Sequence, residues 1–262
     1  MLELYKGRYE ILLDSIMKIP FNTLMARSVI VGDADGRVFV SSYESPQSFY
    51  IIHSSGMTFL CGDSTDEDFN KGLFNYFHSI SNGRKKDEWL QAFPRDWDVV
   101  MQRLIDENKA TLHERLNFKF DLVKFNETYK QMGKTLHEVI SPSIETLFEL
   151  HGSVVPKDYW RSHERFNDIA KAFSVMIDGK LAATAFASAR HDNQLEIGIE
   201  TVKEHHGKGL AYLVCAKLVE YCIDNDLEPV WSCRSGNIGS VNLAKKLGFV
   251  ESLRMPYYHV PF

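Results

Sequence analysis

Two patterns of apolar and polar positions alternate along the chain, and each predicts a different kind of element. Residues 3–18 carry apolar side chains near helical spacing and predict an amphipathic helix. The segment RSVIVGDADGRVFVSSY, which begins at Arg27, places Asp35-Gly36 between two apolar runs. This dipeptide predicts a β-hairpin, because a tight turn needs positive φ at its centre. The runs SFYII and MTFLCG continue the predicted sheet.

The second half of the chain shows the same two patterns of apolar and polar positions. Residues 171–189 predict another hairpin with Asp178-Gly179 at its turn, and residues 194–202 predict a strand. A long helix over 207–225 follows, then a short strand. The next helix stops at Gly248, a residue type typical of the position just past a helix end.

Strands and helices therefore alternate in both halves. The order after residue 36 is three strands, helix, strand, helix, strand, and the order after residue 179 is much the same. We predict an α/β (α+β) protein with a mixed sheet flanked by helices. Two domains are expected, over residues 1–125 and 126–262.

Composition and charge exclude several classes of function. With 262 residues and 44% hydrophobic content, the chain can bury one large or two small cores. Its net charge of -5 argues against a nucleic-acid binder. No apolar run reaches about 18 residues, so we expect no membrane span, and the N-terminus lacks the layout of a signal peptide. The four cysteines form no close CxxC pair, which predicts no metal site, reduced thiols and a cytoplasmic protein.

The stretch IETVKEHHGKGLAYLVCAKLVEYC carries the chemistry, because it places two glycines where a strand becomes a helix. A helix start offers unpaired N–H groups and a partial positive charge, and Gly207 and Gly209 let a phosphate approach the backbone closely. Lys208 and His206 add positive charge. The alternative is that the glycines only make a tight turn. The spacing fits neither a P-loop nor a dinucleotide fingerprint.

The loop resembles the coenzyme A loop of the GNAT superfamily of N-acetyltransferases, whose pattern is Gln/Arg-x-x-Gly-x-Gly/Ala. Here it reads Glu204-x-x-Gly207-x-Gly209, so its first position departs from the pattern. A second signature of the superfamily is similar to the segment from Asn237 through KKLGF to Phe249. The segment YCIDNDLEPVWSC, with IGIET before the loop and SVNLAKKLGF after it, also resembles a two-domain group that includes zwittermicin A resistance-type acetyltransferases. This resemblance extends over nearly the whole chain.

This resemblance implies a GNAT-like fold in the C-terminal half and an enzyme that transfers acetyl directly from acetyl-CoA to an amine. It also implies which residues contact the coenzyme. On the strand before the loop these are Ile199, Thr201 and Val202. In the loop and helix start they are His206, Gly207, Lys208, Gly209, Leu210 and Ala211. On the last helix they are Asn237, which we also expect to cap that helix, Ser240 and Ala244.

Two carboxylates are candidates for the base that deprotonates the amine. Glu196 and Glu200 are four apart on one strand, so they share a face with Gly198, whose small size is expected to leave room for substrate. Glu200 is favoured over Glu196, because it sits nearer the expected position of the acetyl group. The alternative is that both are solvated charges. Many relatives place a tyrosine acid where this chain has Ala244. Tyr258, Tyr257 or His259 near the C-terminus are considered as substitutes, but ordinary strand packing is the preferred interpretation of each.

The N-terminal half is interpreted as a degenerate GNAT-like unit without a coenzyme site. Where the coenzyme loop would lie it has GDSTDEDFNKG, whose carboxylates would repel a pyrophosphate. We expect this half to shape the acceptor site or to form an oligomer interface, such as that of a homodimer.

The predicted acceptor is the amine of a small, antibiotic-like molecule, with no nucleic-acid or membrane partner. The acidic balance of the chain suits a cationic acceptor. Two other functions stay open: acetylation of a protein amine, and a non-catalytic module that binds acyl-CoA, which the absence of the tyrosine at Ala244 favours.

Overall fold

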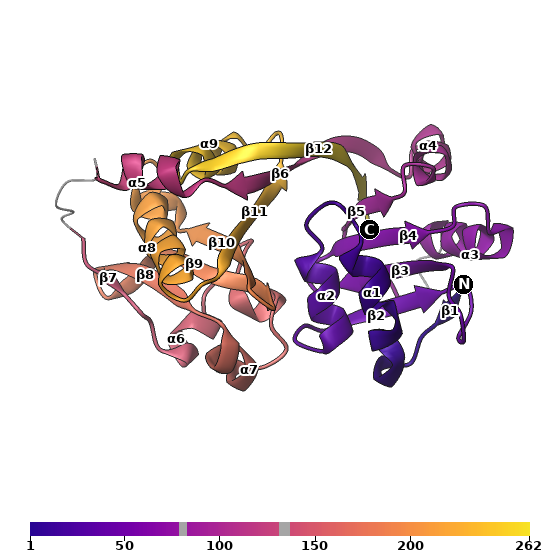
Figure 1. Cartoon of the computed structure of the whole chain (residues 1–262), viewed down its shortest axis with the longest axis horizontal. Helices are drawn as coiled ribbons and strands as arrows, with labels where there is room; N and C mark the ends of the chain where they lie inside the picture. The colour runs from indigo at the N-terminus through magenta and orange to yellow at the C-terminus, as the bar shows by residue number, and fades with distance from the viewer. Residues whose placement is uncertain (79–82, 131–136) are drawn as a thin grey trace. The chain divides into compact units, whose positions relative to one another are not determined.

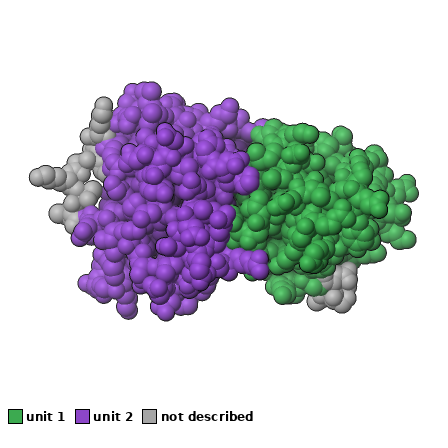
Figure 2. All heavy atoms as spheres, turned by 60° about the horizontal axis from the view of Figure 1, so that its bottom comes forward, with its two compact units in different colours: residues 1–115, 254–262 green, residues 116–253 purple. Residues whose placement is uncertain are grey.

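The computed structural model describes residues 1–78, 83–130 and 137–262. Two compact units make up the chain, coloured separately in Figure 2: unit 1 is Met1–Arg115 with Arg254–Phe262, and unit 2 is Leu116–Leu253. These units differ from the predicted domains 1–125 and 126–262 in two ways: residues 116–125 belong to unit 2, and residues 254–262 return to unit 1.

Unit 1 is a mixed sheet with helices. Its strands are β1 (Leu2–Glu3), β2 (Gly36–Val40), β3 (Ser48–His53), β4 (Met57–Gly62) and β5 (Glu88–Phe93), in that spatial order, followed by the end of β12 (Phe249–Val260). Its helices are the 3₁₀ helix η1 (Lys6–Leu12), α1 (Leu13–Met17), α2 (Leu24–Val31), α3 (Glu67–His78) and α4 (Trp97–Asp106) (Figure 1). Neighbouring strands are antiparallel except β4 and β5, which are parallel.

The predicted hairpin at Asp35-Gly36 is wrong, because the run before it is the helix α2 rather than a strand. This helix is buried along almost its whole length, from Leu24 to Ile30. Burial on all sides outweighs the strand preference of its β-branched residues. Gly32 then ends the helix in the left-handed conformation, with φ of 82°.

Unit 2 contains the predicted site. Its strands, in spatial order, are β7 (Val139–Ile140), β8 (Ala172–Ile177), β9 (Lys180–His191), β10 (Gln194–Thr201), β11 (Glu228–Arg234), the end of β6 (Thr111–Phe120) and the start of β12. Its helices are α5 (Leu122–Lys130), α6 (Ile144–Phe148), η3 (Pro156–Asp158), α7 (His163–Ile169), η4 (Lys203–His205), α8 (Leu210–Asp224) and α9 (Ile238–Lys246) (Figure 1).

The hairpin predicted at Asp178-Gly179 is confirmed. It joins β8 to β9, and both turn residues have positive φ, 51° and 74°. Such a turn matches the twist of the strands that it connects. It begins the antiparallel run β8–β9–β10 on which the site is built.

Helix α8 is the central helix of unit 2, and it packs against β8, β9, β10 and β11. Leu210, Val214 and Leu218 are fully buried on it, and each such side chain contributes roughly 2 kcal/mol of hydrophobic free energy. This packing fixes the direction in which the N-terminus of α8 points.

The two units repeat one order of elements. In unit 1 the antiparallel strands β2–β3–β4 are followed by α3, the parallel strand β5 and α4. In unit 2 the strands β8–β9–β10 are followed by α8, the parallel strand β11 and α9. The strand order expected of a second GNAT-like unit is therefore present.

Candidate active site

The parallel strands β10 and β11 pair over only part of their length. Three pairs join them, Gln194↔Glu228, Leu195↔Pro229 and Glu196↔Val230. Strand β10 continues to Thr201 and β11 continues to Arg234 without further pairing between the two. The strands therefore separate just after Glu196.

The backbone of β10 beyond this point has one edge directed away from β9. Glu228 N–H donates to Asn193 on the β11 side, whereas Val202 N–H donates to Ala182 on the β9 side. Because strand N–H and C=O groups alternate between the two edges, those of Ile197, Ile199 and Thr201 lie on the β11 side. Of the strand residues predicted to contact the coenzyme, Ile199 and Thr201 are on the open edge, while the N–H of Val202 is already bonded.

The glycine loop lies at the start of α8. Gly207 and Gly209 have φ of 75° and 78°, and a Cβ built on either would meet no atom within 4 Å. Gly209 is the N-cap of α8, so the loop leads straight into the unpaired N–H groups of the first turn. The open space around both glycines is what close approach of a phosphate to this backbone requires.

Two basic side chains of the loop, His206 and Lys208, are exposed. His206 is bonded through Nε2 to the carbonyl oxygen of Thr201 at 2.8 Å, which ties the loop to the end of β10. Lys208 Nζ lies 3.2 Å from Nδ1 of His205. A positive group therefore stands beside the helix start, as predicted.

Helix α9 is capped as predicted: the Asn237 Oδ1 accepts a hydrogen bond from the N–H of Ser240 at 3.2 Å. Ser240 Oγ in turn accepts from Trp231 Nε1 at 3.2 Å. Ala244 has no exposed surface, so its side chain presents nothing to a ligand in this structure. Asn237 and Ser240 stay candidates for coenzyme contact.

Glu196 is buried at the point where the two strands separate. Its Oε1 accepts a hydrogen bond from the Ser232 hydroxyl of β11 at 3.0 Å. A carboxylate thus stands next to the first open backbone groups of β10. Sequence analysis missed Ser232, because a single serine in a short strand gives no signal of its own.

Glu200 is held by a segment that is distant in sequence. Its Oε2 accepts from the N–H of Ser153 and of Val154, each at 2.8 Å, and from the Ser153 hydroxyl at 3.2 Å. Gly152 permits this contact, because a Cβ there would lie 2.5 Å from the Glu200 carboxyl carbon. The carboxylate therefore anchors the 152–154 segment. No local pattern in the sequence pointed to this partner.

Gly198 does not leave the room that we expected for substrate. A Cβ at this position would lie 2.8 Å from the ring of Phe186, the residue paired with Gly198 on β9. Phe186 also meets Tyr159 edge to face, with ring centroids 5.8 Å apart. The absence of a side chain at Gly198 accommodates this aromatic packing.

Tyr258 belongs to unit 1, whereas Glu196 and Glu200 belong to unit 2. Its hydroxyl donates to Asp98 at 2.7 Å, and burial together with this carboxylate raises the pKa of Tyr258. Tyr258 thus has a hydrogen-bond partner within unit 1, as expected if it is a packed strand residue rather than the acid.

The four cysteines are buried and form no disulfide. Burial raises the pKa of Cys61 and Cys215, and raises that of Cys222 to about 12, so these thiols stay protonated near neutral pH. Within the described residues, no cluster of His, Cys, Asp and Glu side chains could hold a metal ion. Nor does any described helix combine the length and hydrophobicity needed to cross a membrane.

The mixed sheet, with two parallel strands that separate beside a glycine loop and a helix start, agrees with the acetyltransferase fold that the resemblance implied. Over residues 16–258 the sequence matches the family of GNAT acetyltransferases, and the chain belongs to that family. It is an N-acetyltransferase, as the sequence predicted.

Relatives span nearly the whole chain. The uncharacterized N-acetyltransferase YdfB of Bacillus subtilis (strain 168) is 25% identical over 232 residues, which is 88% of each chain. A GCN5-related N-acetyltransferase-like protein from Streptococcus suis has a TM-score of 0.72 at 19% identity, covering 97% of this chain and 99% of that one. A tandem GNAT protein from the clavulanic acid biosynthesis pathway has a TM-score of 0.61 at 12% identity, covering 99% and 97%. At these identities the structural likenesses support the fold.

Proposed function

We propose that the protein transfers an acetyl group from acetyl-CoA directly to the amine of a small, antibiotic-like molecule where β10 separates from β11. The observation that carries this proposal is the open edge of β10 next to the glycine loop. The edge starts beside Glu196, and the loop lies just beyond Thr201. One extended ligand with a phosphate group at one end matches this layout.

The residues present fit coenzyme A. The C=O of Ile197, the N–H and C=O of Ile199 and the N–H of Thr201 suit pantetheine, which would add to β10 like another strand. The N–H groups around Gly207 and Gly209 and the charge of Lys208 suit the pyrophosphate. When bound, acetyl-CoA supplies the activated acetyl group as a thioester.

Glu196 is proposed as the base, ahead of Glu200. It accepts the proton that the amine loses as the new N–C bond forms and the C–S bond breaks, and the departing thiolate takes up a proton from water. An N–H on the open edge of β10 stabilises the negative charge that develops on the carbonyl oxygen. Ser232, which donates to Glu196 at 3.0 Å, fixes the orientation of the carboxylate.

Glu200 is proposed as a positioning residue. It shares a face of β10 with Glu196, and its carboxylate holds the 152–154 segment through two backbone bonds of 2.8 Å. That segment then forms a fixed wall on the face where the amine has to approach. The net charge of -5 suits a cationic acceptor.

Unit 1 is proposed not to bind the coenzyme. Its parallel strands β4 and β5 pair from Met57↔Trp89 to Cys61↔Phe93, so no comparable open edge is found along them. At the start of α3 the carboxylate of Asp66 accepts from Phe69 N–H at 2.9 Å and so occupies a position where a phosphate would bind. Four buried cysteines without a disulfide are consistent with a cytoplasmic location.

Titration calorimetry with acetyl-CoA, followed by a transfer assay over small amines and peptide amines, tests the proposal. We expect one coenzyme per chain and transfer to small cationic amines. Binding of coenzyme without transfer to any amine would favour a non-catalytic module, and transfer to peptides alone would favour a protein acetyltransferase.

A further inference from the structure

Unit 1 contains a cavity of about 300 Å³ that the acetyl-transfer chemistry does not use. It lies where β3 ends and β5 begins, and Ile52, Gly56 and Tyr76 contribute to its walls. Its volume is at the lower end of the range for small-molecule sites. We propose that this cavity binds a small organic anion, independently of the transfer site in unit 2.

Charge is the first reason. The cavity is lined by five cationic side chains, Lys6, Arg37, Arg84, Lys85 and Lys86, and by two carboxylates, Asp35 and Glu88. In a chain whose net charge is -5, this local excess of positive charge is unusual.

Several of these charges are already balanced. Arg37 pairs with Glu3 at 2.8 Å, and Lys6 pairs with Asp35 at 3.4 Å. Among the described carboxylates, none pairs with Lys85 or Lys86, and Lys86 donates instead to the carbonyl oxygen of Ser54 at 2.7 Å. The uncompensated charge at the cavity is therefore positive.

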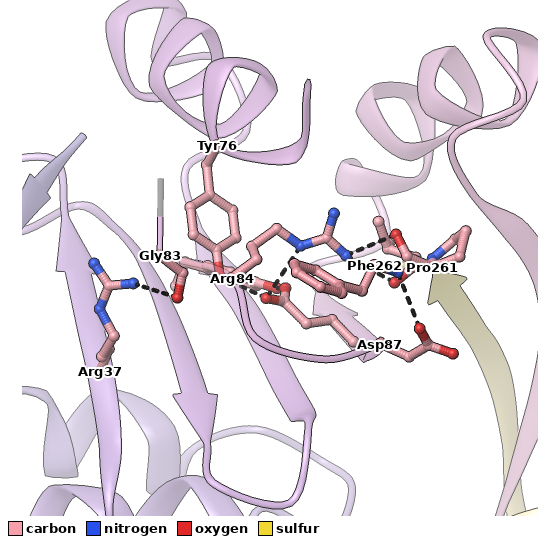
Figure 3. A network of polar contacts seen from close by, with 10 residues as sticks. Arg37, Tyr76, Gly83, Arg84, Asp87, Pro261 and Phe262 are labelled. Carbon is pink, nitrogen blue, oxygen red and sulfur yellow. Dashed lines mark hydrogen bonds and ion pairs between the residues drawn. The ribbon is translucent and has the colours of Figure 1, made fainter. Parts of the chain in front are cut away.

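Arg84 is the second reason, because its side chain is only 6% exposed and its guanidinium is held from two sides. Figure 3 shows it next to Tyr76 and the end of the chain. Its Nη2 donates to the carbonyl oxygens of Val260 and Pro261 at 2.9 and 3.0 Å, and its Nε lies 3.5 Å from Glu88. Among the described residues, none accepts a hydrogen bond from Nη1, which leaves a fixed donor for a ligand oxygen.

The carboxylate of Glu88 does not make the cavity a site for a cation. Its two carboxylate oxygens accept from the hydroxyls of Tyr50 and Tyr76, each at 2.5 Å, in addition to the contact with Arg84. Its charge is thus satisfied from within the fold, and a cationic ligand would face the lysines. The walls around Ile52 and the Tyr76 ring suit an apolar body, which points to an organic anion with a carboxylate or phosphate group.

Titration of the full chain with charge-matched probes tests this site. Benzoate and hexanoate carry the anion, benzamide and hexanamide are their neutral counterparts, and inorganic phosphate and phenyl phosphate distinguish the two anionic groups. We expect at least one organic anion to bind at millimolar concentration or better, and its neutral counterpart to bind at least about tenfold more weakly. Equal binding of acid and amide, or no binding by any organic anion, would overturn the proposal.

Two variants locate the binding. Lys85→Ala/Lys86→Ala should weaken it about fivefold, whereas Lys71→Ala/Lys109→Ala, which removes two other exposed lysines of unit 1, should leave it unchanged. Ile52→Phe should abolish binding by filling the cavity without a change of charge. The affinity for acetyl-CoA should be the same in all three variants. A negative result for the anion site would therefore leave the proposed transfer reaction untouched. Unchanged binding in both cavity variants would refute the site.

Discussion

The carboxylate of Glu200 and the backbone N–H of Ser153, 47 positions apart in the sequence, are joined by a hydrogen bond of 2.8 Å. The bond connects β10 to the segment that follows α6. The partners of Glu200 are backbone groups that need an acceptor, so its carboxylate is engaged before any substrate binds. This relationship separates the roles of the two glutamates of β10 and can be tested by substitution.

Replacing Glu200 with alanine removes the acceptor of two backbone bonds, and we expect the KM for the amine to rise about tenfold while kcat falls less. Glu200→Gln keeps an oxygen that can accept both bonds, so it should recover most of this loss. Steady-state kinetics across pH is the measurement. If Glu200 were instead the base, both variants would lose about a hundredfold in kcat and the acidic limb of the pH profile.

Gly152→Ala should reproduce the effect of Glu200→Ala, because the new Cβ would lie 2.5 Å from the Glu200 carboxyl carbon and push the segment away. Gly239→Ala is the matched control: its Cβ would meet only Asn237 Oδ1, at 3.8 Å, so the change should be harmless. The comparison uses acceptor KM and coenzyme affinity. Loss of coenzyme affinity in Gly152→Ala, with an unchanged acceptor KM, would contradict the assignment.

Substitution of the loop glycines tests the coenzyme site. Gly207→Ala and Gly209→Ala strain a backbone with φ near 75° and 78° without any steric contact, at a cost of roughly 1 kcal/mol. We expect coenzyme affinity to fall about fivefold or more by calorimetry. Gly179→Ala carries the same strain, with φ of 74° and open space, in the hairpin turn of unit 2. An equal loss of affinity in that control would mean that strain, not the loop, is responsible.

Glu196→Gln should reduce kcat about a hundredfold with little change in coenzyme affinity, because the neutral amide cannot take the proton from the amine. Ser232→Ala removes the 3.0 Å bond that orients the carboxylate but keeps the carboxylate itself, so a smaller loss, about fivefold, is expected. Rates at saturating acetyl-CoA across pH check both. A Glu196→Gln variant with a normal rate and pH profile would rule out this base.

The sequence predicted the local parts of this molecule well. The Asp178-Gly179 hairpin, the glycine loop and the Asn237 cap each depend on neighbouring residues, and each is found. The prediction failed at α2, where burial in the fold overrides the strand preference of the β-branched residues.

The partners of the two glutamates could not be predicted from the sequence, for a related reason. Ser153 and Ser232 meet Glu200 and Glu196 only because the fold brings distant segments together, and a lone serine has no periodicity to detect. The return of residues 254–262 to unit 1 is of the same kind. Contacts between residues distant in sequence are set by the topology rather than by local pattern.

His53 predicts how the stability of unit 1 depends on pH. Burial, reinforced by Lys86, lowers the pKa of its imidazole from 6.5 to about 3, and its Nδ1 accepts the N–H of Ser55 at 2.9 Å. Below pH 6.5 the unfolded chain takes up a proton here, whereas the folded chain does so only near pH 3. This residue should therefore reduce the free energy of unfolding as pH falls through that range, by about 1.4 kcal/mol per pH unit.

His53→Asn separates this effect from the titration of carboxylates, since its side-chain oxygen can still accept the Ser55 N–H but does not titrate. Urea unfolding of both proteins between pH 7 and 4 measures the difference. We expect the original chain to lose about 3 kcal/mol more than the variant across this range. If the free energy of unfolding changed with pH by the same amount in both proteins, His53 would be protonated as readily in the folded chain as in the unfolded one.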